Sequence, residues 1–214
     1  MAAVIVLGTA LAGCSGGSTK VIRDQVEADR VFGEVAELTK DALMKNVTSQ
    51  PLNAQDLANL EKAKPMIKGL IAFDPTKYRI YVVNAQTLLA LGERDAAQEN
   101  FEQALLNAPD PAQASSEDRF IMAECHSDLS NIAYSNNQLS VSEDEIRAAL
   151  RLVPPHKDSP ASQKYLLNLT QIQLAQQRFD EAKKTLAEVR AIWPTSEGAK
   201  ELGAMLEDES GKQK

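Results

Sequence analysis

Four prolines divide most of this chain into segments of similar pattern. Pro75 and Pro109 are 34 residues apart, and Pro154 and Pro194 follow at intervals of 45 and 40 residues. Each proline closes a segment whose apolar residues recur at helical spacing, and proline ends helices because it lacks an amide hydrogen and clashes with the preceding turn. A helical unit that recurs in this way predicts stacked similar units, each too small to bury its apolar face alone.

The unit that ends at Pro109 alternates large and small side chains in a fixed order. Small residues let two helices approach closely, and large apolar residues fill the space between successive helix pairs. The landmarks are Tyr81, Ala85, Leu88, Gly92, Ala97, Phe101 and Ala104; before Pro194 they are Leu166, Leu169, Thr170, Ala182, Leu186 and Val189; before Pro154 they are His126, Leu129, Ser130, Ala133, Asn137, Ser142, Ile146 and Ala149. The longer intervals then place extra residues in linkers at 110–122 and 155–162.

This order of residues resembles the tetratricopeptide repeat, a helix–turn–helix unit of about 34 residues. The resemblance covers residues 53–208 and implies an all-α right-handed superhelical solenoid of about nine helices. Three repeats are expected at 78–109, 123–154 and 163–194 within the region 76–194. An irregular helical pair at 20–75 would precede them, and a capping helix with a polar tail at 195–214 would follow.

Capping residues and apolar positions predict where the remaining helices begin and which way they face. A long helix over 20–46 should turn Val31, Phe32, Val35 and Leu38 inward, and a second helix should run from Asn53 to Phe73 with a kink at Pro65. In the final helix, Leu202, Met205 and Leu206 share one side. Helix starts are indicated by Asn53 with Asp56, Ser142 with Glu145, and Ser159 followed by Pro160.

The first nineteen residues are typical of an export signal and tether. Residues 1–13 carry no charge, and Leu11-Ala12-Gly13-Cys14 resembles the bacterial lipobox. The resemblance implies cleavage before Cys14, fatty acylation of that residue and a flexible tether at 14–19; Ser15 then favours the outer membrane, with the domain facing the periplasm. No Lys or Arg precedes the apolar run, which departs from the usual signal. The alternative is a buried first helix with a core cysteine.

Neither the charge of the chain nor its motifs indicate an enzyme or a nucleic-acid-binding protein. Thirty acidic and 23 basic residues give a net charge of −7, which repels phosphate backbones. We expect no catalytic residue, metal, cofactor or small-molecule substrate, because no catalytic or phosphate-binding motif occurs and the two histidines are 30 residues apart. The acidic run 143–145 is predicted to complement a helix N-terminus. A thiol enzyme that uses Cys125 is a minor alternative, and it would need an exposed thiol of low pKa.

The resemblance implies instead that the first helix of each repeat lines a groove for a partner segment. Groove positions predicted from helical spacing are Arg79, Val82, Val83, Gln86, Ser127, Asp128, Asn131, Tyr134, Lys164, Leu167, Asn168 and Gln171. A lipobox, a tether and a few repeats also resemble the tetratricopeptide lipoproteins of pilus biogenesis, both type IV pilotins and tight-adherence (Flp) pilus proteins. That resemblance implies a secretin or pilus-assembly partner. The alternative is a scaffold for peptidoglycan hydrolases or for outer-membrane barrel assembly.

Overall fold

The computed structural model describes residues 21–48 and 50–211, and this part of the chain contains nine α-helices and no strand. The helices are α1 (Gln25–Val47), α2 (Ala54–Phe73), α3 (Tyr78–Ala90), α4 (Arg94–Asn107), α5 (Ser116–Ser135), α6 (Leu139–Leu152), α7 (Pro160–Ala175), α8 (Phe179–Ile192) and α9 (Glu197–Gly211). Within the described ranges, no helix has both the length and the apolarity needed to cross a bilayer.

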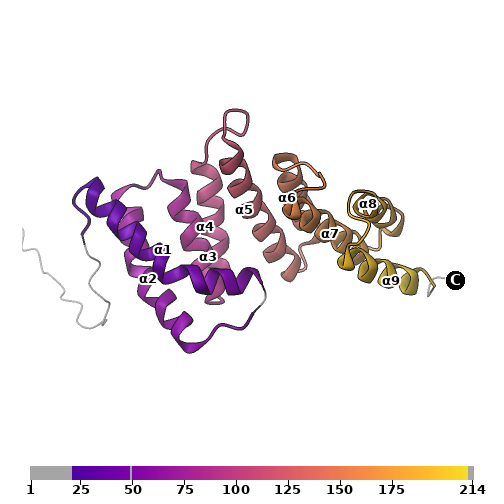
Figure 1. Cartoon of the computed structure of the whole chain (residues 1–214), viewed down its shortest axis with the longest axis horizontal. Helices are drawn as coiled ribbons and strands as arrows, with labels where there is room; N and C mark the ends of the chain where they lie inside the picture. The colour runs from indigo at the N-terminus through magenta and orange to yellow at the C-terminus, as the bar shows by residue number, and fades with distance from the viewer. Residues whose placement is uncertain (1–20, 49, 212–214) are drawn as a thin grey trace, which may run out of the picture.

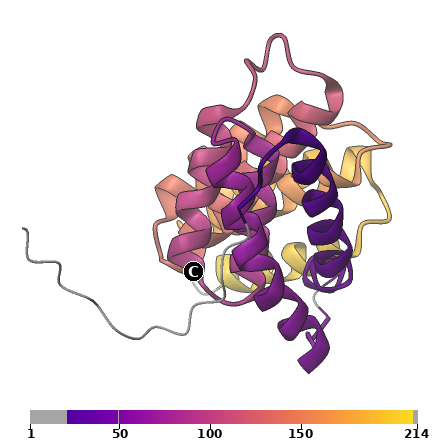
Figure 2. The same ribbon diagram turned by 90° about the vertical axis from the view of Figure 1, so that its left-hand side faces the viewer.

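The helices pack in consecutive pairs, α1 with α2, α3 with α4, α5 with α6 and α7 with α8. Figure 1 shows these pairs following one another along the long axis, with α9 at the far end. Helix α1 also packs against α3, and it crosses in front of α2 and α3 in that view. Seen from the α1 end in Figure 2, the later pairs lie behind the first. The all-helical solenoid that the repeats predict is therefore confirmed.

The same backbone turn joins the helices of the three later pairs. Gly92, Asn137 and Gln177 all have positive φ, at 81°, 59° and 61°. These residues are 45 and 40 positions apart, the same intervals that separate the last three prolines. In each turn the next residue donates its amide to a carbonyl five positions earlier, as Glu93 does to Leu88. The common geometry supports the repeat register read from the prolines.

Only one of the three turns has the residue that suits positive φ best. Glycine has no Cβ to clash in this conformation, whereas glutamine is strained there by about 1 kcal/mol. We expect Gln177→Gly to raise the free energy of unfolding by about 0.5 kcal/mol, after the greater freedom of glycine in the unfolded chain is deducted. Gly92→Ala, the reverse change at the matching position, should lower it by about 1 kcal/mol. Urea unfolding measures both; a destabilised Gln177→Gly would contradict the shared turn geometry.

Small residues meet where the two helices of a pair cross. Ser130 on α5 and Ser142 on α6 are both fully buried, and each hydroxyl donates to the carbonyl oxygen of the other residue, at 2.8 and 2.9 Å. The prediction that Ser142 caps a helix is wrong, because α6 begins earlier, at Leu139. Ser142 instead bonds across the pair, where a larger side chain would push the helices apart.

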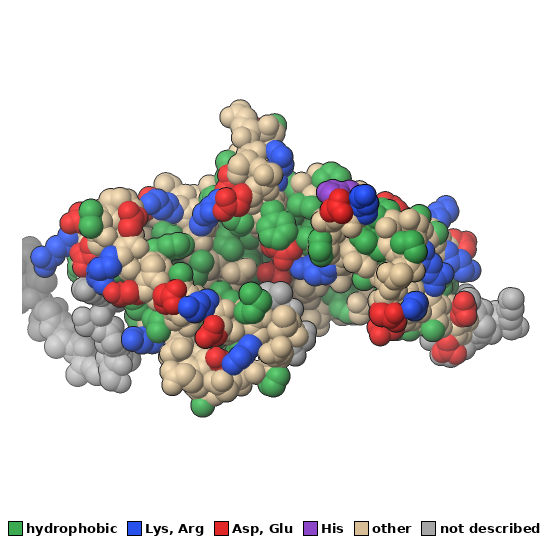
Figure 3. All heavy atoms as spheres, in the orientation of Figure 1, with side chains coloured by type: hydrophobic (Ala, Val, Ile, Leu, Met, Phe, Trp, Pro, Cys, Tyr) green, Lys and Arg blue, Asp and Glu red, His purple; other side chains and the backbone are tan. Residues whose placement is uncertain are grey.

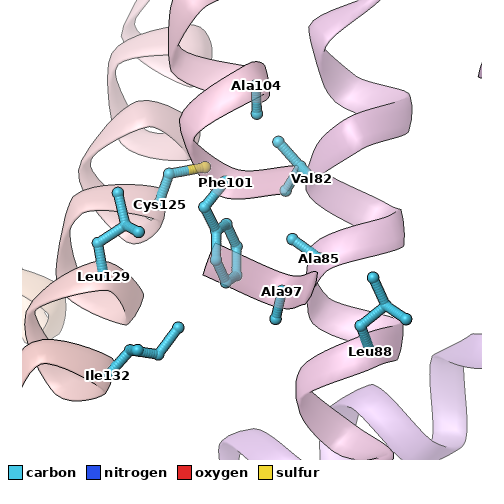
Figure 4. Packing of buried hydrophobic residues seen from close by; sticks show 9 residues of the cluster. All are labelled: Val82, Ala85, Leu88, Ala97, Phe101, Ala104, Cys125, Leu129 and Ile132. Carbon is cyan, nitrogen blue, oxygen red and sulfur yellow. The ribbon is translucent and has the colours of Figure 1, made fainter. Parts of the chain in front are cut away.

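Each core cluster includes side chains from the helix that follows its pair. Phe101 on α4 is fully buried and packs against Val82 and Ala85 of α3 as well as against α5. Figure 4 shows its ring lying between the α3 side chains and those of Cys125, Leu129 and Ile132 on α5. Because α5 supplies one wall of this cluster, the α3–α4 pair does not bury its apolar surface alone.

The capping predictions at two other helices are confirmed. Asn53 and Asp56 form a reciprocal capping box at the start of α2, and the Ser159 hydroxyl accepts the amide of Ser162 before Pro160 opens α7. Helix α2 continues through Pro65 to Phe73. In α1, Val31 and Val35 are buried, and Phe32 and Leu38 pack against the same cluster, as their spacing predicts.

Three boundary or facing predictions are wrong. Residues 116–122 were expected in a linker, but they form the first two turns of α5, which the Ser115 hydroxyl caps by accepting the amide of Asp118. Helix α1 begins at Gln25, after the Asp24 cap, rather than at Lys20. Met205 is 54% exposed, although its neighbours Leu202 and Leu206 are buried. The export signal, Cys14 and the tether lie outside the described residues.

Candidate partner-binding groove

The first helices of the later pairs, α3, α5 and α7, together line one face of the solenoid, which we call the groove. Figure 3 shows this face hollowed near its middle, with hydrophobic and acidic side chains in the hollow. A pocket of about 290 Å³ lies where α1 approaches α3 and α5. It is lined by Phe32, Arg79, Val82, Val83, Gln86, Phe120, Ile121 and Glu124. The pocket can hold one large apolar side chain of a partner.

Most of the predicted groove positions are accessible on this face. The four positions on α3 all line the pocket, although Val82 is only 8% exposed because it also packs in the Phe101 cluster. Asn131 on α5 accepts a hydrogen bond from Asn168 on α7 at 3.3 Å. Tyr134 and Gln171 line a second hollow of about 410 Å³ that continues to α8 and α9. Lys164 is exposed between these regions. Whether they contact a partner stays a prediction.

One predicted position is turned away from a partner. Ser127 is fully buried and its hydroxyl has no hydrogen-bond partner among the described residues, so it cannot be a groove contact. Helical spacing alone placed Ser127 on the groove, because spacing does not show how far a neighbouring helix covers a position. Leu167 is half-buried and packs partly with the cluster that joins α7, α8 and α9, so its contact with a partner stays a prediction.

An ion-pair network holds one end of the groove. Arg79 on α3 reaches Glu117 at 2.7 Å and Asp118 at 2.8 Å, both on the first turn of α5. Asp118 also accepts hydrogen bonds from Ser115 and Tyr78. Together, Ser115, Tyr78 and Arg79 hold the pKa of Asp118 well below its ordinary value. Arg79 therefore ties α3 to α5, and its charge is largely compensated within the chain.

Two carboxylates one helical turn apart lie at the middle of the groove. Glu124 accepts hydrogen bonds from the Lys164 ammonium at 2.9 Å and from the Tyr165 hydroxyl at 2.5 Å. Asp128 has neither a hydrogen bond nor an ion pair to any residue that the structure describes. Burial raises the pKa of Asp128 to about 7; Lys164 opposes the rise and Glu124 adds to it.

Comparisons with known proteins agree with this arrangement. A sequence profile described as tetratricopeptide repeat matches residues 82–117, from α3 to the start of α5. Two crystal structures of MamA superpose with TM-scores of 0.56; one is 14% identical and covers 75% of this chain and 86% of its own, and the other is 15% identical and covers 84% of each. The fold is a tetratricopeptide-repeat solenoid.

A third solved structure aligns less well with this chain. The crystal structure titled "YrrB: a TPR protein with an unusual peptide-binding site" aligns at a TM-score of 0.34 and 12% identity, over 83% of this chain and 99% of that one. The search of curated protein sequences found no match.

In this tetratricopeptide array, Cys125 serves packing rather than catalysis. Its side chain is 1% exposed within the Phe101 cluster, and burial raises the pKa of the thiol to about 12. A nucleophilic cysteine needs an accessible thiolate, so the thiol-enzyme alternative is wrong. The adjacent His126 faces a different helix, and its Nδ1 lies 2.6 Å from a Glu145 carboxylate oxygen on α6.

The acidic run at 143–145 joins repeats instead of complementing a helix start. Because α6 begins at Leu139, Glu143 lies in the second turn, where it is buried. It pairs with Arg147 at 2.7 Å and with Arg178, which precedes α8 in the next repeat. Burial opposes ionisation of Glu143, but hydrogen bonds from Arg147, Gln176 and Arg178 outweigh it and lower the pKa. The helix-dipole prediction for this run is wrong.

Sequence reasoning missed the groove residues contributed by α1 and by the start of α5. Phe120, Ile121 and Glu124 line the pocket, yet the first two of them were placed in a linker and Glu124 was not assigned to the groove. The Ser115 cap with acidic residues in the next turn was a visible signal for the longer helix. Phe32 was expected only as core, because nothing in the repeat pattern indicates that α1 crosses α3.

Proposed function

We propose that this protein is a non-enzymatic adaptor that binds protein partners in the groove. The observation that carries this proposal is the exposed apolar pocket within a polar groove. Phe120 is 45% exposed at the pocket wall, beside half-buried Val83 and Ile121. Exposed aromatic side chains at a concave site are typical anchors for a partner. The net charge of −7 makes nucleic acid an unsuitable occupant.

We propose further that the adaptor is anchored by lipid on Cys14 to the bacterial outer membrane and faces the periplasm. The support is the lipobox-like sequence at 11–14, the Gly- and Ser-rich residues after it, and Ser15. Several acyl chains on one residue give a stable anchor where a single chain does not. A flexible tether would then let the solenoid reach partners near the membrane.

The proposed partner is a secretin or another pilus-assembly component. Support comes from the resemblance to pilus-biogenesis lipoproteins, which share the lipobox, tether and small number of repeats. A scaffold for peptidoglycan hydrolases or for barrel assembly is the second candidate, since it would have the same anchor and repeats.

Site-specific photocrosslinking in the native bacterium tests both the groove and the partner. A photoreactive amino acid at Gln171, exposed in the groove, should give a discrete adduct with another protein, while the same group at Lys184, exposed on α8, should give none. Mass spectrometry of the adduct then separates a secretin or pilus component from a hydrolase or barrel-assembly protein. Equal adducts at both positions, or adducts only at Lys184, would reject the groove as the binding surface.

A further inference from the structure

The groove contains an apolar pocket and an unpaired carboxylate in adjacent positions. Glu124 lines the pocket, and Asp128 lies one turn further along the same face of α5. The pocket walls include Phe32 and Phe120, from elements on opposite sides. A partner segment that enters the pocket therefore passes close to both carboxylates.

The two carboxylates differ in whether donors within the chain already pair with them. Glu124 is already engaged by Lys164 and Tyr165 at 2.9 and 2.5 Å. Asp128 is partly buried without a compensating donor in the described part of the chain, an arrangement that costs free energy. A cation supplied from outside would remove that cost and would gain a charge-assisted hydrogen bond.

We infer that the groove selects a partner segment in which a large apolar side chain is followed by a lysine or arginine, the apolar group filling the pocket and the cation pairing with Asp128. This inference rests on the proposed adaptor function and specifies its ligand. The net charge of −7 favours basic segments at long range, and the local charges decide which carboxylate the cation reaches.

Pairing with a cation makes binding depend on pH. The groups that face Asp128 are Glu124 and Cys125 on α5 and Lys164 and Tyr165 on α7. In the free protein the pKa of Asp128 is about 7, so at pH 6 most of this carboxyl is protonated and has no charge to offer. Affinity for a basic segment should therefore rise about 10-fold from pH 6 to pH 8, because binding requires the deprotonated form.

A random 12-residue peptide library displayed on phage, panned against the purified full chain, supplies the probes. Selected peptides without histidine are synthesised, and their affinities are measured by fluorescence anisotropy at pH 6 and pH 8. We expect an apolar residue near a basic one in these peptides. Replacing the basic residue by glutamine, or making Asp128→Asn in the protein, should each weaken binding about 10-fold at pH 8, and Asp128→Asn should abolish the pH dependence.

Two control variants distinguish failure of the cation inference from failure of the adaptor proposal. Asp144→Asn, an exposed position on α6, should leave affinity unchanged. Phe120→Ala should weaken every groove-bound peptide, basic or not. If Phe120→Ala weakens binding, but neither Asp128→Asn nor the replacement of the basic peptide residue by glutamine does, the cation inference is overturned and the adaptor proposal stands. Peptides whose affinity is unchanged by Phe120→Ala, or a library that yields no binding peptide, would contradict both the cation inference and the adaptor proposal.

Discussion

Replacing Phe101 by alanine should lower the free energy of unfolding by about 3–5 kcal/mol. The ring is fully buried where α3, α4 and α5 meet, and its neighbours include small residues such as Ala85 and Ala97. Small neighbours have no flexible side chains with which to fill the space, so most of the cavity should persist. Removing the ring also weakens the packing between the α3–α4 pair and α5, so both repeats should unfold more easily.

The matched control is Phe120→Ala, which removes the same ring from a 45% exposed position on α5. That change should cost less than about 1 kcal/mol, since exposed substitutions away from the core have small effects. Urea unfolding followed by circular dichroism measures both variants. Equal losses for Phe101 and Phe120 would show that the ring of Phe101 does not join the repeats as described.

Cys14→Ser should release the protein from the membrane completely. The serine hydroxyl does not replace the thiol as acceptor of the diacylglyceryl group, and the acyl chains are the proposed anchor. Fractionation of cells followed by immunoblotting measures this: the natural protein should sediment with the outer membrane, and the variant should remain in the supernatant.

Cys125→Ser is the control, because it also replaces a cysteine by serine but leaves Cys14 in place. Its side chain is buried in the repeat core, so this variant should still sediment with membranes if it folds. A Cys14→Ser protein that stays with the outer membrane would contradict lipidation of Cys14 as the anchor.

The repeat architecture was predictable because its determinants are local. Proline ends a helix by its own covalent structure, and positive φ at Gly92 follows from a residue without a Cβ. Asn53 with Asp56 satisfies the free amides of a helix start within four residues. Features of this kind depend on neighbours in sequence, so no knowledge of the tertiary structure was needed to find them.

The groove was only partly predictable because its surface depends on contacts between repeats. Helical spacing identified the correct face of α3, but the burial of Ser127 depends on the packing of adjacent helices. Phe32 reaches the pocket only because α1 crosses α3, and a degenerate first pair gives no register from which to expect this. Ser142 could not be assigned from local sequence either. Its sequence resembles a helix cap, but its hydroxyl donates a hydrogen bond across the helix pair to the Ser130 carbonyl oxygen.

Hydrogen–deuterium exchange of the chain, alone and with the partner identified by crosslinking, tests the groove most directly. Binding there should slow exchange in α3, α5 and α7 and leave α4 and α6 unchanged, because α4 and α6 contribute no residue to the lining of either hollow. Protection confined to α4 and α6 would contradict the claim that the groove is the binding surface.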